Sequence, residues 1–332
     1  KRQNDDTAPQ ITEGLQFFSQ AYTPSTANCD LYIHCTASVG ETTNIADDVG
    51  MALFINDQTN ALRAVTDYSV HGANLVICGR RESVLAETAS EFKDKYGVDV
   101  RYQPLDIRSP QDVEDFIDAV FEEGPLHGLV NNAAGNFISP TKDLSARGFD
   151  AIANIVFHGT FYVTNAVGKK WLEHKIKGSI ISILATWVWT GSPFVVPSAM
   201  SKSALHTMTK SLAVEWGPHG IRINAIAPGP FPTEGAWARL SPKGALDEDS
   251  SSMSSIPMGR VGEMSELQNL ATFLMADGCE YLTGQTIALD GAQYLSGGGT
   301  FSQLSKMTED DWADIRSMIK KTNDSDKAKR ST

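Results

Sequence analysis

The segment spanning residues 179–216 constrains the fold more than any other part of the sequence. It opens with an apolar, mostly β-branched run over residues 180–184, which predicts a buried strand. A loop with glycine and proline follows, and a helix is predicted from Ser198 onward. Lys202 lies one turn into that helix, level with the end of the strand, where open α/β sheets bind their ligands. The apolar residues that repeat on one helix face are Leu205, Met208, Leu212 and Trp216.

The rest of the chain alternates short apolar runs with helical patterns. This alternation predicts an α/β fold with a single Rossmann-like, doubly wound parallel sheet and helices on both of its faces. The predicted strands cover residues 51–55, 75–78, 98–105, 129–130, 221–227 and 285–290, and the predicted helices cover residues 60–70, 82–96, 110–123, 145–174 and 264–277.

Composition divides the chain into three parts. Residues 1–49 form a predicted N-terminal extension that is partly irregular: residues 1–28 are polar and lack sustained periodicity, whereas the residues after them are ambiguous, and a strand could begin at residues 31–33. Residues 50–295 carry the alternating pattern and form the predicted domain, with a flap over residues 230–257 that is rich in Pro, Gly, Ser and acidic residues. Residues 296–332 form a C-terminal extension, where a capping-box-like sequence at Thr308 predicts a final helix.

The net negative charge indicates which kinds of macromolecule this chain is not expected to bind. The chain has 28 Lys and Arg against 40 Asp and Glu, a net charge of −12, which argues against nucleic acid or an anionic membrane. No apolar run is long enough to span a bilayer. The four cysteines are scattered without the spacing of metal ligands, so we expect no metal site and reduced, mostly buried thiols in an intracellular compartment.

The helix around Lys202 carries a recognisable motif. The run from Ser198 to Lys202 reads Ser-Ala-Met-Ser-Lys, and the same helix ends in Ala-Val-Glu-Trp-Gly at residues 213–217. This sequence resembles the active-site helix of the short-chain dehydrogenase/reductase family. The flanking residues 194–199 and 226–230 resemble its 2,4-dienoyl-CoA reductase branch, in which Ser replaces the usual Tyr four residues before the Lys. The resemblance covers about residues 50–322.

The resemblance implies NADPH as the cofactor. Arg80 and Arg81 end the second strand, where relatives hold the ribose 2′-phosphate, and Lys202 matches the Lys that holds the nicotinamide ribose. Asp106 matches the acid near the adenine, although it also suits an ordinary helix cap. The remaining positions that the resemblance assigns to the cofactor are Asn132, Ala133, Gly135, Pro228 and Gly229.

The phosphate-binding turn departs from the family pattern. Relatives carry a Thr-Gly-x-x-x-Gly-x-Gly run, whereas the corresponding residues 55–62 contain no glycine and include Asp57. A carboxylate repels phosphate, and side chains fill the space that glycine leaves open. An alternative placement at residues 35–40 keeps one glycine but leaves too much chain before Gly72. We therefore expect dinucleotide binding to be weak or lost, with a differently bound cofactor as the alternative.

The proton-donating position also differs. In the dienoyl-CoA reductases a Tyr hydroxyl and an Asn amide polarise the thioester carbonyl; the Asn corresponds to Asn136, and Ser198 and Lys202 complete the set. The Tyr position falls at Trp187, whose indole N–H donates a hydrogen bond but cannot deliver a proton near neutral pH. Other family catalytic positions are replaced by Ala185, for Ser, and Val156, for Asn.

Trp187 and Trp189 are expected to alternate on one side of an extended segment. Such a pair suits buried packing or an interface better than a cap over an acyl pocket.

Two functions remain open from the sequence. The favoured one is a catalytically impaired, 2,4-dienoyl-CoA reductase-like protein that serves as a structural or accessory subunit of a larger assembly. The alternative is an active NADPH-dependent reductase of 2,4-dienoyl-CoA or related enoyl-CoA thioesters. Protein partners or a homo-oligomer are expected, together with acyl-CoA. The start at Lys1 and the family suggest a mitochondrial matrix protein, and the C-terminus lacks the peroxisomal Ser-Lys-Leu signal.

Overall fold

The computed structural model describes residues 50–54, 74–97, 99–231, 255–297, 308–311, 313–315 and 317. The N-terminal extension, the helix predicted over residues 60–70, the phosphate-binding segment 55–62 and residues 232–254 of the predicted flap lie outside the described residues. Within the described residues, no helix is both long and apolar enough to cross a membrane.

The described strands form one parallel sheet of seven strands in the order β3-β2-β1-β4-β5-β6-β7. The strand order reverses between β1 and β4, so the crossovers run outward on both sides of that point and the sheet is doubly wound, as predicted. The strands are β1 (Gly50–Phe54), β2 (Asn74–Gly79), β3 (Val100–Pro104), β4 (Leu126–Asn131), β5 (Gly178–Ile183), β6 (Ile221–Pro228) and β7 (Thr286–Leu289).

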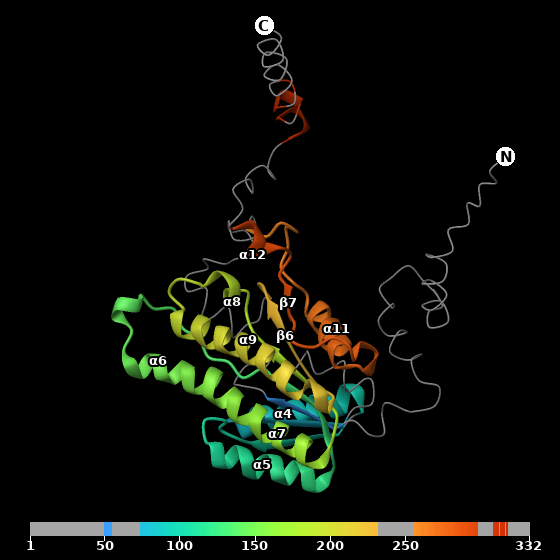
Figure 1. Cartoon of the computed structure of the whole chain (residues 1–332). Coiled ribbons are helices and arrows are strands. Elements are labelled where there is room, and N and C mark those ends of the chain that lie inside the picture. Colours follow the sequence, from blue (N-terminus) through green and yellow to red (C-terminus); the bar gives the residue numbers. More distant parts are fainter. Residues whose placement is uncertain are drawn as a thin grey trace, which may run out of the picture.

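Helices cover both faces of the sheet (Figure 1). One apolar cluster packs α5, α7 and α9 against the strands, and a second packs α4 and α11 on the other face. The main helices are α4 (Glu82–Tyr96), α5 (Pro110–Glu123), α6 (Ala146–Ala153), α7 (Thr160–His174), α9 (Val196–Trp216) and α11 (Met264–Met275). Two four-residue helices, α8 (Trp187–Thr190) and α12 (Gln293–Ser296), lie near the carboxyl ends of the last strands.

Two helices differ in detail from the sequence prediction. Helix α9 begins at Val196 rather than Ser198, because Pro197 fits the first turn, where its missing N–H is not needed. The helix predicted over residues 145–174 is confirmed, with Ser145 as its N-cap, but the π-helical segment Asn154–Gly159 separates α6 from α7. At the predicted final helix, the Thr308 backbone N–H donates to the Asp311 carboxylate at 2.8 Å, and the Asp311 backbone N–H donates to the Thr308 hydroxyl oxygen at 3.3 Å, so the capping box is confirmed.

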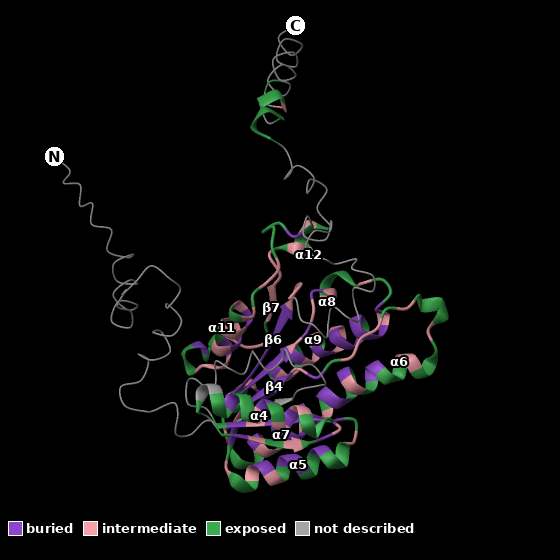
Figure 2. Ribbon diagram, turned by 180° about the vertical axis from the view of Figure 1, so that it is seen from behind, coloured by how far each residue is buried: buried purple, intermediate pink, exposed green. Residues whose placement is uncertain are grey.

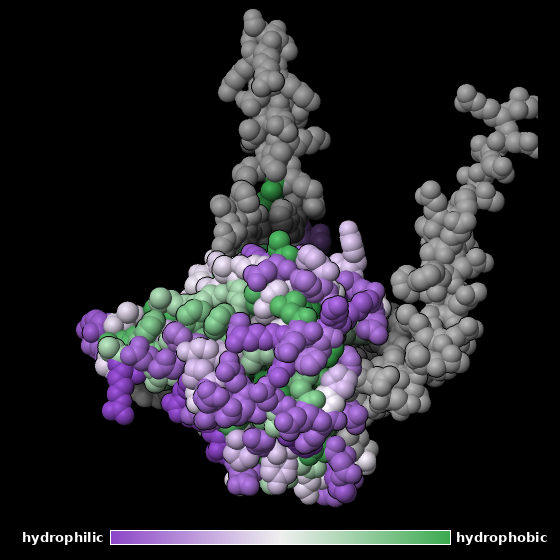
Figure 3. Space-filling model, turned by 60° about the horizontal axis from the view of Figure 1, so that its bottom comes forward, coloured by the Kyte–Doolittle hydropathy of each residue, from purple (hydrophilic) through white to green (hydrophobic). Residues whose placement is uncertain are grey.

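Buried side chains fill the layers, while polar ones cover the outside. Figure 2 shows the buried residues concentrated on the strands and on the inward sides of the helices. The face shown in Figure 3 is mostly hydrophilic, with smaller apolar areas between the polar side chains.

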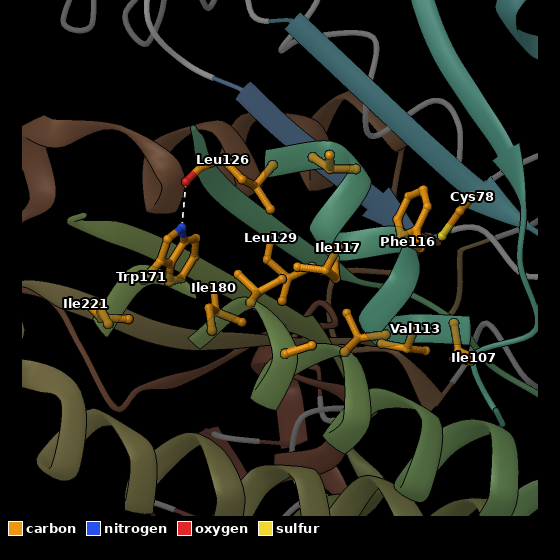
Figure 4. Close-up of a cluster of buried hydrophobic side chains, with 14 of the residues drawn as sticks. Cys78, Ile107, Val113, Phe116, Ile117, Leu126, Leu129, Trp171, Ile180 and Ile221 are labelled. Carbon is orange, nitrogen blue, oxygen red and sulfur yellow. Dashed lines mark hydrogen bonds between the residues drawn. The ribbon is translucent and has the colours of Figure 1, made fainter. Parts of the chain in front are cut away.

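Trp171 on α7 anchors the larger core cluster (Figure 4). Its side chain is 0% exposed, and its indole N–H donates to the carbonyl oxygen of Leu126 at 2.5 Å. Gly178 lies directly against the ring, since a Cβ added there would come within 2.6 Å of the indole carbons. The indole therefore joins α7 to the beginnings of β4 and β5, and it requires glycine at the start of β5.

Replacing Trp171 by Phe should lower the free energy of unfolding by about 2–4 kcal/mol, because the Leu126 carbonyl loses its donor and a void is left beside β5. Denaturant unfolding measures this change. Val214→Ala is the control, since that side chain is 80% exposed and its loss should change stability by less than about 0.5 kcal/mol. Equal, small changes in both variants would contradict the assignment of Trp171 to the core.

Candidate functional site

Lys202 lies at the centre of the site. Its side chain is only 6% exposed, and Nζ donates to the carbonyl oxygen of Ile183, the last residue of β5. The predicted place, level with the end of the strand, is confirmed, but the side chain is buried rather than solvated. Burial lowers the pKa of the Lys202 ammonium to about 8, because its charged form is partly stripped of water.

Ser198 and Asn136 approach the same end of the sheet. Ser198 is 4% exposed and lies four residues before Lys202 on α9, so the two side chains share one face of the helix. Asn136 follows β4, and its Oδ1 accepts a hydrogen bond from the backbone N–H of Phe137 at 2.9 Å. This hydrogen bond orients the amide group of Asn136 and leaves its NH₂ group as the part that can donate.

Trp187 and Trp189 do not lie in an extended segment, so that prediction is wrong. Both belong to the helical turn α8, where residues two apart point to different sides. Trp189 stacks on Tyr294 of α12 with ring centroids 4.8 Å apart, and it meets the edge of His206 at 5.9 Å. Trp187 is half-buried and is left on a separate side of the turn from Trp189. Trp189 is 39% exposed, so it packs against two aromatic rings without being buried.

The end of β4 and the segment after it contain one buried structural residue, Asn131, followed by residues that are buried to different extents. Asn131 is 5% exposed, and its Nδ2 donates to Thr164 Oγ1 at 2.9 Å and to Ser182 Oγ at 3.4 Å, which ties β4 to α7 and β5. The predicted cofactor positions that follow lie between these strand ends. Of these, Ala133 is buried, Asn132 and Gly135 are half-buried, and a Cβ added at Gly135 would lie 3.2 Å from Ile152.

Asp106 and Arg80 lie together beyond the ends of β3 and β2. The Asp106 carboxylate accepts two hydrogen bonds from Nε of Arg108, at 2.8 and 2.9 Å. This pairing lowers the pKa of the Asp106 carboxyl, and the nearby charge of Arg80 contributes in the same direction. Asp106 does not cap α5, because Ser109 is the N-cap of that helix. The alternative interpretation of Asp106 as a helix cap is therefore wrong.

A pocket of about 560 Å³ adjoins these charges and is lined by Arg80, Asp106, Asp112, Asp115, Gln103 and Phe116, among others. It lies at the β2–β3 end of the sheet rather than beside Lys202. Arg81, the N-cap of α4, is exposed at the same end.

Gly229 brings two strand ends into contact. A Cβ added at Gly229 would lie 2.6 Å from the Cβ of Asp290, and the Gly229 N–H donates to the Leu289 carbonyl at 2.9 Å. The glycine after Pro228 is therefore required for the close approach of the ends of β6 and β7, whether or not a cofactor contacts it. Sequence reasoning missed Arg108 and Tyr294, for which the sequence carries no distinguishing pattern.

Comparison with known proteins agrees with this fold and arrangement. The family model described as "Enoyl-(Acyl carrier protein) reductase" matches residues 56–292. The "Probable 2,4-dienoyl-CoA reductase decr-1.2" of Caenorhabditis elegans, described as (3E)-enoyl-CoA-producing, is 40% identical over 262 residues, covering 77% of this chain and 84% of the relative.

Two solved structures are similar over nearly their whole length. A short chain dehydrogenase from Bacillus anthracis has a TM-score of 0.65 at 37% identity, covering 74% of this chain and 96% of that chain. A variant of actinorhodin polyketide ketoreductase with NADPH has a TM-score of 0.68 at 26% identity, covering 75% and 98%. The chain belongs to the short-chain dehydrogenase/reductase family, within its 2,4-dienoyl-CoA reductase-like group.

The buried ammonium predicts a pH dependence of stability. The pKa of Lys202 is about 8 in the folded protein and 10.5 as an ordinary value. Between these values the unfolded chain binds more protons, so the free energy of unfolding should rise with pH, by up to about 3 kcal/mol from this group. Lys202→Met should remove this rise, as measured by urea unfolding at a series of pH values from 7 to 10.5.

Lys169→Met is the matched control, since this lysine of α7 is 60% exposed and its replacement should leave the slope of the wild type unchanged. Identical pH dependence in the wild type and in Lys202→Met would contradict the buried ammonium.

Proposed function

We propose that this protein is an NADPH-dependent reductase of 2,4-dienoyl-CoA or related enoyl-CoA thioesters. The observation that carries the proposal is the buried Lys202 at the carboxyl end of β5. A buried cation is unfavourable for stability and is found mainly where function needs it. The names of the similar proteins support the same reaction class, which was the alternative in the sequence analysis and is here preferred over an inactive subunit.

The residues around Lys202 fit the nicotinamide end of the cofactor. A compact ammonium beside the strand ends suits the two ribose hydroxyls, and the half-buried positions after β4 leave backbone close to the ligand. Arg80 and Arg81, at the ends of β2 and the start of α4, suit the 2′-phosphate of NADPH rather than the bare ribose of NADH. When bound, NADPH supplies a hydride to the conjugated chain.

The chain's own residues act on the thioester carbonyl. The Asn136 amide group donates to the carbonyl oxygen, and the indole N–H of Trp187, the first residue of α8, is the second donor. Donors fixed before the reaction stabilise the negative charge that develops on that oxygen. Because indole does not release a proton near neutral pH, water delivers the proton that completes the reduction. Ser198 contributes a polar hydroxyl to the face of α9 that carries Lys202.

A second function follows from the same indole. Because Trp187 stands at the position of the Tyr whose hydroxyl acts in relatives, this chain lacks that hydroxyl. The lack favours a non-catalytic subunit that works through protein partners or as a homo-oligomer. That role, in a mitochondrial assembly, is the proposal that remains if turnover is absent.

Turnover distinguishes the two functions. Purified full-length protein with NADPH and a 2,4-dienoyl-CoA should oxidise NADPH, measured by absorbance. Restoring a hydroxyl with Trp187→Tyr should raise kcat by roughly 10²-fold, because a positioned acid typically contributes about 10²–10⁴-fold. Trp187→Phe is the matched control, as it keeps an aromatic ring but has no donor, and its kcat should fall below that of the wild type.

If neither the wild type nor Trp187→Tyr oxidises NADPH at high enzyme concentration, the reductase proposal is wrong. Equal rates for the wild type and Trp187→Phe would show that the indole N–H makes no contribution to the reaction.

A further inference from the structure

Phe194 holds an unusual backbone conformation between α8 and α9. Its φ is 65°, in the left-handed region that side chains other than glycine rarely adopt. Among the described residues other than glycine, Lys175 and Ala292 also have a positive φ; Lys175 is the C-cap of α7, and Ala292 immediately precedes α12. Phe194 follows Pro193 in a turn just before α9, at a turn position where a positive φ normally selects glycine or asparagine, so a phenylalanine there carries a conformational cost.

The strained conformation coincides with a hydrogen bond between two loops. The Phe194 carbonyl oxygen accepts from the backbone N–H of Ser139 at 2.9 Å. Ser139 lies three residues after Asn136, in the segment that follows β4. The carbonyl oxygen of the next residue, Val195, accepts a hydrogen bond from the Ala199 N–H at 3.0 Å, which is the first hydrogen bond of α9. One dipeptide thus connects the Asn136 loop with the first turn of the helix that carries Ser198.

The side chain of Phe194 does not explain its conformation. The ring is 54% exposed, so packing of this ring against the core provides little of the energy that a left-handed phenylalanine requires. Val195, its neighbour, is 4% exposed and therefore fixes the chain on the α9 side. The left-handed backbone therefore serves the turn formed with Pro193 and, through it, the carbonyl contact with Ser139.

We infer that Phe194 is a positioning residue, whose left-handed backbone fastens the Asn136 loop to the start of α9. The hydrogen bond to Ser139 sets the distance between the Asn136 amide and Ser198, which approach the same end of the sheet from different elements. We call the Ser139–Phe194 hydrogen bond the clasp. An effect of the clasp on catalysis rests on the proposed function, whereas its effect on the position of the Asn136 loop does not.

Three substitutions separate backbone from side chain at this position. Phe194→Gly and Phe194→Asn lose the ring but accept a positive φ, whereas Phe194→Val keeps an apolar side chain whose β-branch opposes it. Hydrogen exchange of the full-length protein, followed by mass spectrometry, reports on the peptide that contains Ser139. We expect roughly threefold or more faster exchange of this amide in Phe194→Val, because its β-branch adds to the cost that Phe194 already carries, and less than about twofold change in the other two.

Faster exchange in Phe194→Gly and Phe194→Asn, with Phe194→Val like the wild type, would show that the ring holds the loop and would overturn the inference. Equal exchange in all four proteins would overturn it as well, because the clasp would then not depend on φ.

Kinetics add the catalytic consequence. With a turning-over wild type, Phe194→Val should lower kcat at least roughly tenfold while NADPH affinity stays within about twofold, and the Gly and Asn variants should recover most of kcat. If kcat of Phe194→Val equals that of the wild type despite faster exchange, the clasp does not position the catalytic groups. If the wild type does not turn over, the proposed function fails on its own, and hydrogen exchange still decides whether the clasp exists.

Discussion

The hydrogen bond from the Lys202 ammonium to the Ile183 carbonyl is the interaction on which the site depends. It places a cation in a largely water-free position, where a charged group is stable only if polar atoms surround it. The carbonyl belongs to the last residue of β5, and the lysine to the second turn of α9. The geometry of the site is therefore set by how this strand and this helix pack, which links the function of the protein directly to its core.

Close backbone approaches maintain that packing. Gly178 admits the indole of Trp171 at the beginning of β5, and Gly229 admits Asp290 where β6 and β7 end. The first contact fixes the far end of the strand that carries the Lys202 partner, and the second fixes the edge next to it. At both positions a Cβ atom would clash with the neighbouring residue, which is sufficient to explain the glycine. Gly229, which belongs to the family motif, therefore has a structural role in addition to any contact with a ligand.

The sequence was sufficient to predict the helices and strands that have strong periodicity, but it was not sufficient to predict the conformation of the connections between them. The strand and helix around Lys202 could be predicted because β-branched and helical patterns are both regular there. The turn α8 could not, because alternating Trp and Val favour a strand locally, and the contact of Trp189 with Tyr294, over a hundred residues later, overrides that preference. The left-handed Phe194 is invisible for a similar reason, since a local propensity does not reveal a hydrogen bond to a distant loop.

The central claim is that Lys202 and the strand ends form a working NADPH site although residues 55–62 lack glycine. Calorimetric titration of the purified full-length protein with NADPH tests this most directly, with NADH and an Arg80→Ala, Arg81→Ala double variant for comparison. The account predicts measurable heat with NADPH, weaker binding of NADH, and a loss of that preference in the double variant. No heat with NADPH at high ligand concentration would contradict the account and leave a reductase fold without its cofactor.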